Sequence, residues 1–191
     1  MSFKSAVITF PGSNCDRDAL TYLRDLTQGE VLNIWHEESS LPNVDLVILP
    51  GGFSFGDYLR SGAMAAKSNI IHDVIDHANN GRYLLGICNG FQILTEIGLL
   101  KGALIQNKSI KFLGKDCHIK KKFDNKFNCN IKDDEVLQIP VAHNEGNFYC
   151  DQESKKPVSI VNITLWTDKT INLAQSMTLC DSTCKIFRFV I

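Results

Sequence analysis

The stretch Arg82–Gly98, RYLLGICNGFQILTEIG, predicts a strand that turns sharply into a helix. Its apolar beginning, Tyr83–Ile87, is typical of a buried parallel strand. Its end carries apolar residues at the spacing of one helical face, namely Phe91, Leu94 and Ile97. Cys88 stands at the junction between Gly86 and Gly90, which makes a cysteine version of the G-x-S-x-G nucleophile elbow. The turn of such an elbow is too tight for side chains at the two flanking positions, so glycine fits there.

Cys88 is the predicted nucleophile. Main-chain N–H groups and the helix dipole stabilise a thiolate at a helix N-terminus, so we expect the pKa of Cys88 to fall toward neutrality. The alternative is that Cys88 is a small buried apolar residue, as many free cysteines are. We favour the nucleophile because the strand, the two glycines, the cysteine and the helix occur in the required order.

Composition describes an ordinary globular chain of 191 residues, with 44% hydrophobic and 21% charged residues. The net charge of −1 gives no sign of a nucleic-acid or membrane partner. The seven cysteines form no C-x-x-C pair, which favours reduced thiols over a disulfide framework or a zinc site. No apolar run approaches the ~18 residues of a membrane-spanning helix. We therefore predict a single cytoplasmic domain over residues 1–191, without a metal.

The predicted elements upstream of the elbow follow the order strand, helix, strand, strand, helix. Turn residues follow the first strand, and Ser13 or Asn14 can cap the helix after it. The predicted strands are Ser5–Phe10, Glu30–Trp35 and Val44–Leu49, and the predicted helices are Asp16–Leu26 and Asn69–Asn79. This order predicts an α/β fold: an open, mostly parallel, flavodoxin-like sheet with helices on both faces.

Three loops are expected to meet at one edge of this sheet. Ligands of open α/β sheets bind beyond the carboxyl ends of the strands. The first strand ends in Pro11-Gly12, the third in Pro50-Gly51-Gly52, and the elbow strand in Cys88. We therefore expect the glycine loops and the cysteine to converge.

Four segments between about residue 5 and about residue 150 resemble one family. GICNGFQIL resembles the nucleophile segment of class I, triad-type glutamine amidotransferases. More narrowly, the four segments are similar to those of the amidotransferase subunits of phosphoribosylformylglycinamidine synthase, an enzyme of purine synthesis. They are FPGSNCDRD (10–18), LPGGFSFGDYLRSGA (49–63), GICNGFQILTEIGLL (86–100) and IPVAHNEGNF (139–148).

The resemblance implies a mechanism for L-glutamine. Cys88 would attack the side-chain amide carbon and form a thioester, which water then cleaves. Main-chain N–H groups of Gly52 and Asn89 would hold the oxyanion, and Gln92 would help to bind glutamine. Ammonia would pass to a separate synthetase subunit that uses ATP and Mg²⁺, and a small third subunit is expected in the complex. The resemblance implies no cofactor on this chain.

The general base departs from the family pattern. The family places its histidine and glutamate in a His-Pro-Glu segment, but this sequence has no histidine after His143, and residues 154–191 form an atypical tail. One hypothesis is that His143 and Glu145, which have H-x-E spacing, serve as base and orienting residue. The other is that the chain is truncated or frame-shifted after about residue 154 and the triad is incomplete. We favour the second, which predicts weak or absent glutaminase activity.

Two alternative functions remain open from the sequence. The first is a catalytically impaired scaffold subunit that still binds the synthetase subunit but lacks the His/Glu of the triad. The second is a DJ-1/PfpI-like thiol hydrolase, which would share the elbow and Cys88 but not the three flanking motifs.

Overall fold

The computed structural model describes residues 3–121, 130–149, 163–165 and 186–189. These residues fall into two compact units, one from Met1–Leu100 with Thr183–Val190 and the other from Lys101–Ser182. Each unit is described by itself below. In the described part of the chain, no helix has both the length and the apolar character needed to cross a bilayer.

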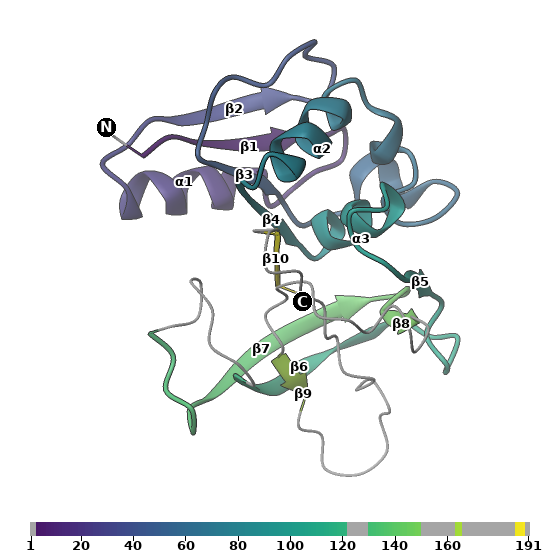
Figure 1. The fold of residues 1–191 in the computed structure, drawn as a ribbon. Coiled ribbons are helices and arrows are strands. Elements are labelled where there is room, and N and C mark those ends of the chain that lie inside the picture. The colour runs from purple at the N-terminus through teal and green to yellow at the C-terminus, as the bar shows by residue number, and fades with distance from the viewer. Residues whose placement is uncertain (1–2, 122–129, 150–162, 166–185, 190–191) are drawn as a thin grey trace. The chain divides into compact units, whose positions relative to one another are not determined.

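The strands and helices of the first unit follow the predicted order up to α3 (Figure 1). Helix α1 and strand β4 have the predicted bounds, and the other predicted strands and helices upstream of the elbow differ from prediction by one to two residues at an end, where helices and strands fray. Its elements are β1 (Ser5–Thr9), α1 (Asp16–Leu26), β2 (Val31–Trp35), β3 (Leu46–Leu49), the 3-10 turns Ser54–Asp57 and Ala65–Lys67, α2 (Ile71–Asn79), β4 (Tyr83–Ile87), α3 (Asn89–Glu96) and β10 (Ile186–Phe189).

The sheet of the first unit has the strand order β10-β4-β3-β1-β2, and all its pairs are parallel. The chain leaves β1 toward β2 on one side and later continues from β3 to β4 on the other. Right-handed crossovers in opposite directions place α1 and α2 on opposite faces of the sheet. The predicted α/β fold class is confirmed, and the reversal between β1 and β3 is where such sheets bind ligands.

Most side chains of the central strands are buried, as expected for strands covered on both faces. In β1 and β3, Ala6, Val7 and Val47 are fully buried. The predicted helix cap is wrong: the N-cap of α1 is Cys15, and it makes no side-chain capping bond. Asn14 instead uses its Oδ1 to accept a bond from the Cys15 thiol at 3.4 Å.

Most of the atypical tail predicted at 154–191 lies outside the described residues. Two short pieces of it are described: β10 and β9 (Ile163–Leu165). The backbone of β10 pairs parallel with β4, from Ile186 opposite Leu84 to Phe189 opposite Ile87. The strand that carries the elbow is thus an inner strand of the sheet.

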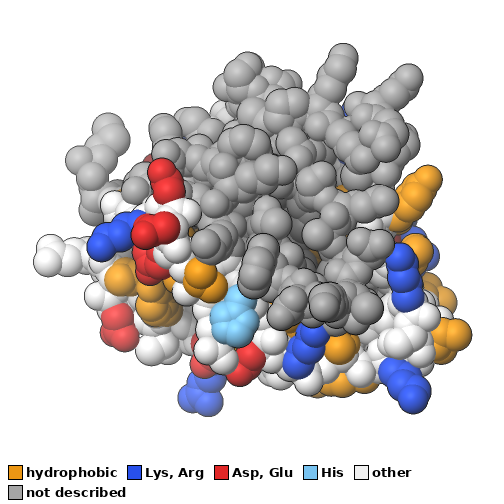
Figure 2. Space-filling model, turned by 90° about the horizontal axis from the view of Figure 1, so that it is seen from below, with side chains coloured by type: hydrophobic (Ala, Val, Ile, Leu, Met, Phe, Trp, Pro, Cys, Tyr) orange, Lys and Arg blue, Asp and Glu red, His pale blue; other side chains and the backbone are white. Residues whose placement is uncertain are grey.

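The second unit is built from antiparallel strands. Its main pair joins β6 (Leu113–Lys121) to β7 (Val136–His143), β9 pairs with the other edge of β6, and β5 (Ala103–Ile105) pairs with β8 (Asn147–Tyr149). Large apolar side chains that are exposed in this unit include Ile110 and Phe112. Figure 2 shows hydrophobic side chains at the surface beside lysine and arginine side chains.

Candidate active site

Cys88 occupies a strained turn between β4 and α3. Its φ is +50°, a value that residues other than glycine rarely adopt, and Cys88 is the N-cap of α3. A Cβ on Gly86 would lie 2.8 Å from the carbonyl oxygen of Gly90, and one on Gly90 would overlap the carbonyl of Leu49. Both glycines are therefore required by close backbone approach, which confirms the elbow geometry predicted from G-x-C-x-G.

The predicted convergence of the three loops is confirmed. Ser13 and Gly52 form an isolated β-bridge, and the Phe55 N–H donates to the Pro11 carbonyl at 2.6 Å. A Cβ on Gly51 would lie 3.3 Å from the Cβ of Cys88. Gly52 has φ +121° and lies against Asn14, so there is no room for a side chain at position 52.

The pKa of the Cys88 thiol is raised, not lowered, which corrects the expectation from the sequence. Burial is the largest cause, and the charge of Asp57 adds to it. The main-chain N–H groups of Gly52 and Asn89 donate hydrogen bonds to the Cys88 sulfur and oppose the rise. Helix-terminus stabilisation is thus present but is outweighed by desolvation.

Cys15 is a close neighbour of this site. A Cβ on Gly51 would lie 3.5 Å from the Cys15 sulfur. Burial raises the pKa of Cys15, and the charges of Asp18 and Cys88 raise it further. Both cysteines are helix N-caps, but only Cys88 is placed by the elbow turn within hydrogen-bond reach of the Gly52 and Asn89 N–H groups.

The Asn89 side chain joins the elbow to the turn that follows Gly52. Its Oδ1 accepts bonds from the Ser54 N–H at 3.1 Å and the Ser54 hydroxyl at 2.6 Å. Its Nδ2 donates to Asp57 Oδ1 at 3.2 Å and to Gln92 Oε1 at 3.0 Å. Asn89 and Ser54 are each 2% exposed and Gln92 is 9% exposed, so this network is shielded from water.

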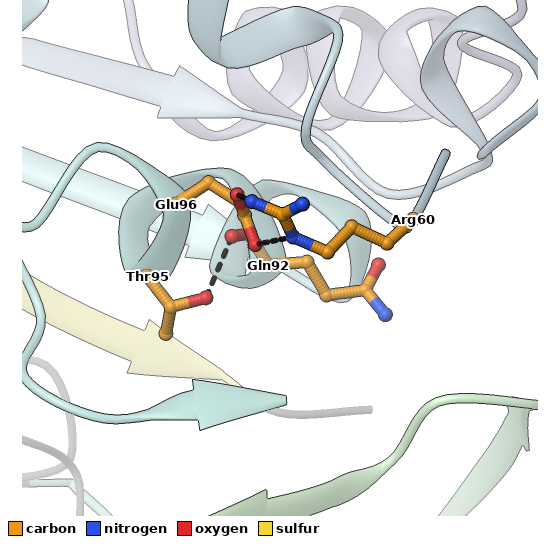
Figure 3. Close-up of polar contacts among 4 residues, drawn as sticks. All are labelled: Arg60, Gln92, Thr95 and Glu96. Atoms are coloured by element: carbon orange, nitrogen blue, oxygen red, sulfur yellow. Dashed lines mark hydrogen bonds and ion pairs between the residues drawn. The ribbon is translucent and has the colours of Figure 1, made fainter. Parts of the chain in front are cut away.

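Further along α3, the same loop is held by a second set of contacts (Figure 3). The Arg60 guanidinium donates to both carboxylate oxygens of Glu96, at 2.7 and 2.5 Å. A Cβ on Gly62 would lie 2.8 Å from the nitrogen of Ile93, so the loop backbone packs directly on the helix. The Thr95 hydroxyl donates to the Gln92 carbonyl at 2.7 Å within the helix.

His143, predicted as a general-base candidate, lies at the end of β7 in the second unit. Its Nδ1 is 3.0 Å from Asn107 Oδ1. The same Oδ1 accepts the Gly146 N–H at 3.0 Å, while Asn107 Nδ2 donates to the carbonyls of Lys111 and His143, both at 2.9 Å. These main-chain partners fix which end of the Asn107 amide is oxygen.

This amide orientation determines the tautomer of His143. Burial lowers the pKa of His143 and so favours the neutral ring. Since Asn107 presents oxygen to Nδ1, Nδ1 carries the hydrogen and Nε2 is the proton acceptor. Asn107 therefore accepts the hydrogen bond from Nδ1–H, which is the role that the H-x-E hypothesis assigns to Glu145.

Sequence reasoning placed Cys88, Gly52, Asn89 and Gln92 in one site, and the structure brings these four residues together. Sequence reasoning missed the contributions of Ser54, Asp57 and Asn107. Ser54 and Asp57 belong to a segment that resembles the family, but nothing in their spacing relates them to Asn89. No local pattern marks Asn107, because its partners lie up to 39 positions away.

The parallel sheet and the cysteine elbow are shared by α/β glutamine amidotransferases and by DJ-1/PfpI-like thiol hydrolases, and comparison with known proteins separates the two. The profile of the CobB/CobQ-like glutamine amidotransferase domain family matches residues 2–166. A PurQ subunit of phosphoribosylformylglycinamidine synthase from Salinibacter ruber is 48% identical over 154 residues, which cover 80% of this chain and 66% of that relative. One from Pelagibacter ubique is 47% identical over 157 residues, covering 81% of this chain and 68% of the relative.

Within that class, the chain belongs to the PurQ family of glutamine amidotransferase subunits of phosphoribosylformylglycinamidine synthase. It spans about two thirds of the length of the curated relatives it matches. The solved structure of PurLQS from Thermotoga maritima contains a similar fold, with a TM-score of 0.82, 35% identity, and coverage of 97% of this chain and 85% of that one. The amidotransferase interpretation is therefore supported over the thiol-hydrolase alternative.

Proposed function

We propose that this chain hydrolyses L-glutamine at Cys88 and delivers the ammonia to a synthetase subunit of phosphoribosylformylglycinamidine synthase. The observation that carries the proposal is the position of Cys88 at the elbow, with the main-chain N–H groups of Gly52 and Asn89 directed at its sulfur. Donors that lie beside the nucleophile before substrate arrives are within reach of an oxyanion that develops on the carbon it attacks.

In the proposed reaction the Cys88 sulfur attacks the side-chain amide carbon of glutamine. Negative charge develops on the amide oxygen, and the N–H groups of Gly52 and Asn89 stabilise it, each donor being worth about 3–4 kcal/mol of barrier. As the tetrahedral intermediate collapses, the proton removed from the Cys88 thiol passes through the base to the leaving nitrogen, so ammonia departs and a glutamyl thioester remains. Water then cleaves the thioester and releases glutamate. Gln92, beside Asn89, contributes to holding the glutamine.

The raised pKa of Cys88 means that the reaction needs a proton acceptor. Asn107 accepts a hydrogen bond from Nδ1–H of His143, so Nε2 of His143 is free of hydrogen and can accept a proton. This supports His143 as a base candidate, with Glu145 in the same loop. An incomplete triad stays the favoured prediction, and with it weak or absent glutaminase activity. His143→Ala tests this: unchanged glutamate release from an active preparation would exclude His143 as the base.

The partners follow from the family. The similar structure from Thermotoga maritima is that of PurLQS, and we propose that this chain assembles with a synthetase subunit and a small third subunit. ATP and Mg²⁺ would be used by the synthetase subunit. The cytoplasmic location stays a prediction.

A glutamine-analogue diazoketone tests the proposal directly. We expect it to label Cys88 covalently, as read by peptide mass spectrometry, and excess L-glutamine to suppress the labelling. Cys15→Ser is the matched control, since Cys15 is the neighbouring thiol and its removal should leave the labelling of Cys88 intact. Cys88→Ser should abolish the labelling.

Glutamine that fails to protect Cys88 from the diazoketone or from alkylation would contradict the proposal. Ammonia transfer is tested by adding the synthetase subunit with formylglycinamide ribonucleotide and ATP, with ammonium chloride as the alternative nitrogen source. Product that forms with ammonium chloride but never with glutamine, in a complex that still co-purifies, would favour the scaffold alternative.

A further inference from the structure

We infer that the Asn89 side chain is a positioning residue: it clamps the Ser54–Asp57 turn onto α3 and fixes the Gln92 amide so that Gln92 presents a hydrogen-bond donor. The proposed function uses only the main-chain N–H of Asn89. The side chain has a separate set of partners, all on the loop or on α3.

The turn that Asn89 holds is strained. Phe55, Gly56, Asp57 and Leu59 all have positive φ, between 54° and 70°. Non-glycine residues reach this region at a cost, so such a loop keeps its shape only when surrounding contacts hold it there. Asn89 bonds to residues on both sides of the Phe55-Gly56 pair, namely Ser54 and Asp57.

The clamp also bears on the oxyanion donor. Gly52 lies two residues before Ser54, and its N–H is directed at the Cys88 sulfur. The elbow provides the second donor, the N–H of Asn89. Through its side chain, Asn89 therefore ties the loop that carries one donor to the helix that carries the other.

The orientation of the Gln92 amide follows from partners that have only one possible role. The Ser54 N–H can only donate, so the Asn89 atom facing it is Oδ1. The other end of the Asn89 amide is then Nδ2, which agrees with its contact to the Asp57 carboxylate. Nδ2 can only donate, so the Gln92 atom facing it is Oε1. The Nε2 donor of Gln92 lies at the opposite end of its amide.

A ligand that bonds to the far end of the Gln92 amide would therefore meet its donor, Nε2, rather than its acceptor. In glutamine the complementary groups are acceptors: the α-carboxylate and the side-chain carbonyl oxygen. This part of the inference rests on the proposed function, whereas the clamp of the Ser54–Asp57 turn does not.

Two measurements test the inference. Hydrogen exchange of the Ser54 main-chain amide, followed by NMR without ligand, reports the clamp. Protection of Cys88 from iodoacetamide by L-glutamine gives a dissociation constant and reports Gln92. We expect Asn89→Ala to speed Ser54 exchange about tenfold or more and to weaken glutamine binding about tenfold. Thr95→Val, which removes a bond to the Gln92 carbonyl and not to its side chain, should change both by less than about twofold.

A swapped pair separates the two roles. Asn89→Asp places carboxylates face to face with Asp57 and should impair both readouts. Adding Asp57→Asn restores a donor facing the new carboxylate at position 89, so slow Ser54 exchange should return. Gln92 would still face a carboxylate oxygen, would turn Nε2 toward it, and glutamine binding should stay weak. A purely structural role of Asn89 would restore both readouts together.

The outcomes that overturn the inference differ for its two parts. Ser54 exchange in Asn89→Ala as slow as in the unmodified chain would overturn the clamp. Glutamine affinity recovered in the swapped pair would overturn the assigned orientation of Gln92. If glutamine does not protect Cys88 in the unmodified chain, the proposed function fails, and Ser54 exchange still decides the clamp.

Discussion

Gly90 lies directly against the main-chain carbonyl of Leu49, so that a Cβ on this glycine would overlap the carbonyl oxygen. Leu49 ends β3 and Gly90 is the second residue of α3. The helix of the elbow is therefore seated on the end of the neighbouring strand, and this contact sets the height at which Cys88 stands above the sheet.

Replacing Gly90 with alanine should displace α3 and destabilise the fold. Relief of the overlap requires a shift of backbone, which we expect to cost about 3 kcal/mol in urea unfolding. Gly98→Ala is the matched control, because Gly98 has φ +74° but open space around it and should cost only about 1 kcal/mol. A loss for Gly90→Ala no larger than that for Gly98→Ala would contradict the role of the Leu49 contact, because Gly90 lies in α3 and its φ is not positive.

The pH dependence of Cys88 alkylation should show a midpoint above that of an ordinary thiol. Burial and the Asp57 charge both disfavour the thiolate, which is the reactive form. Asp57→Asn removes the charge while its amide oxygen can still accept from Asn89, so the midpoint should move to lower pH. A midpoint that stays in place, measured by iodoacetamide rates between pH 6 and 11, would exclude Asp57 as a cause.

His77 should make stability fall in mild acid. The ring is 5% exposed, and burial lowers its pKa, although the bond from Nε2 to the Tyr83 carbonyl opposes this. A lowered folded-state pKa means that the unfolded chain binds the proton first, so stability is full above the unfolded pKa and is lost as pH falls through the folded one. We expect His77→Gln, which can still donate to Tyr83, to flatten this slope in urea unfolding between pH 7.5 and 5. An unchanged slope would contradict the assignment.

Asn107→Ala should loosen the His143 loop. The variant loses the side-chain bonds to Lys111, His143 and Gly146, and we expect about 2 kcal/mol less stability of the second unit. The ¹⁵N shifts of the His143 ring should report Nδ1–H in the unmodified chain and a mixture of tautomers in the variant. A single Nε2–H tautomer in the unmodified chain would contradict the hydrogen-bond assignment.

The elbow shows how far local pattern can lead. Gly86, Cys88 and Gly90 were predictable because the requirements of a tight strand-to-helix turn are local, and both glycines meet backbone in the structure. The direction of the Cys88 pKa was not predictable. The helix terminus that lowers it is visible in the sequence, but the burial that raises it depends on segments packed around the thiol from elsewhere in the chain.

The polar partners were harder still to predict. Asn89 contacts Ser54 across 35 positions, and Asn107 contacts Gly146 across 39. Spacing rules for helices and strands relate residues only a few positions apart, so they cannot pair such side chains. The assignment of Glu145 as the orienting residue of His143 relied on such short spacing, and Asn107 proved to be the partner of Nδ1.

The sequence by itself determined the order of strands and helices, the glycine-flanked cysteine and, through parallel connections, the edge at which the loops meet. These properties depend on periodicity, on backbone freedom and on chain direction, all of which neighbouring residues carry. Only the tertiary structure decided how deeply Cys88 is buried, which end of the Gln92 amide faces Asn89, and which residue accepts the hydrogen bond from His143 Nδ1–H. Each of these depends on groups brought together from distant positions, where desolvation and the one-way chemistry of donors and acceptors determine the result.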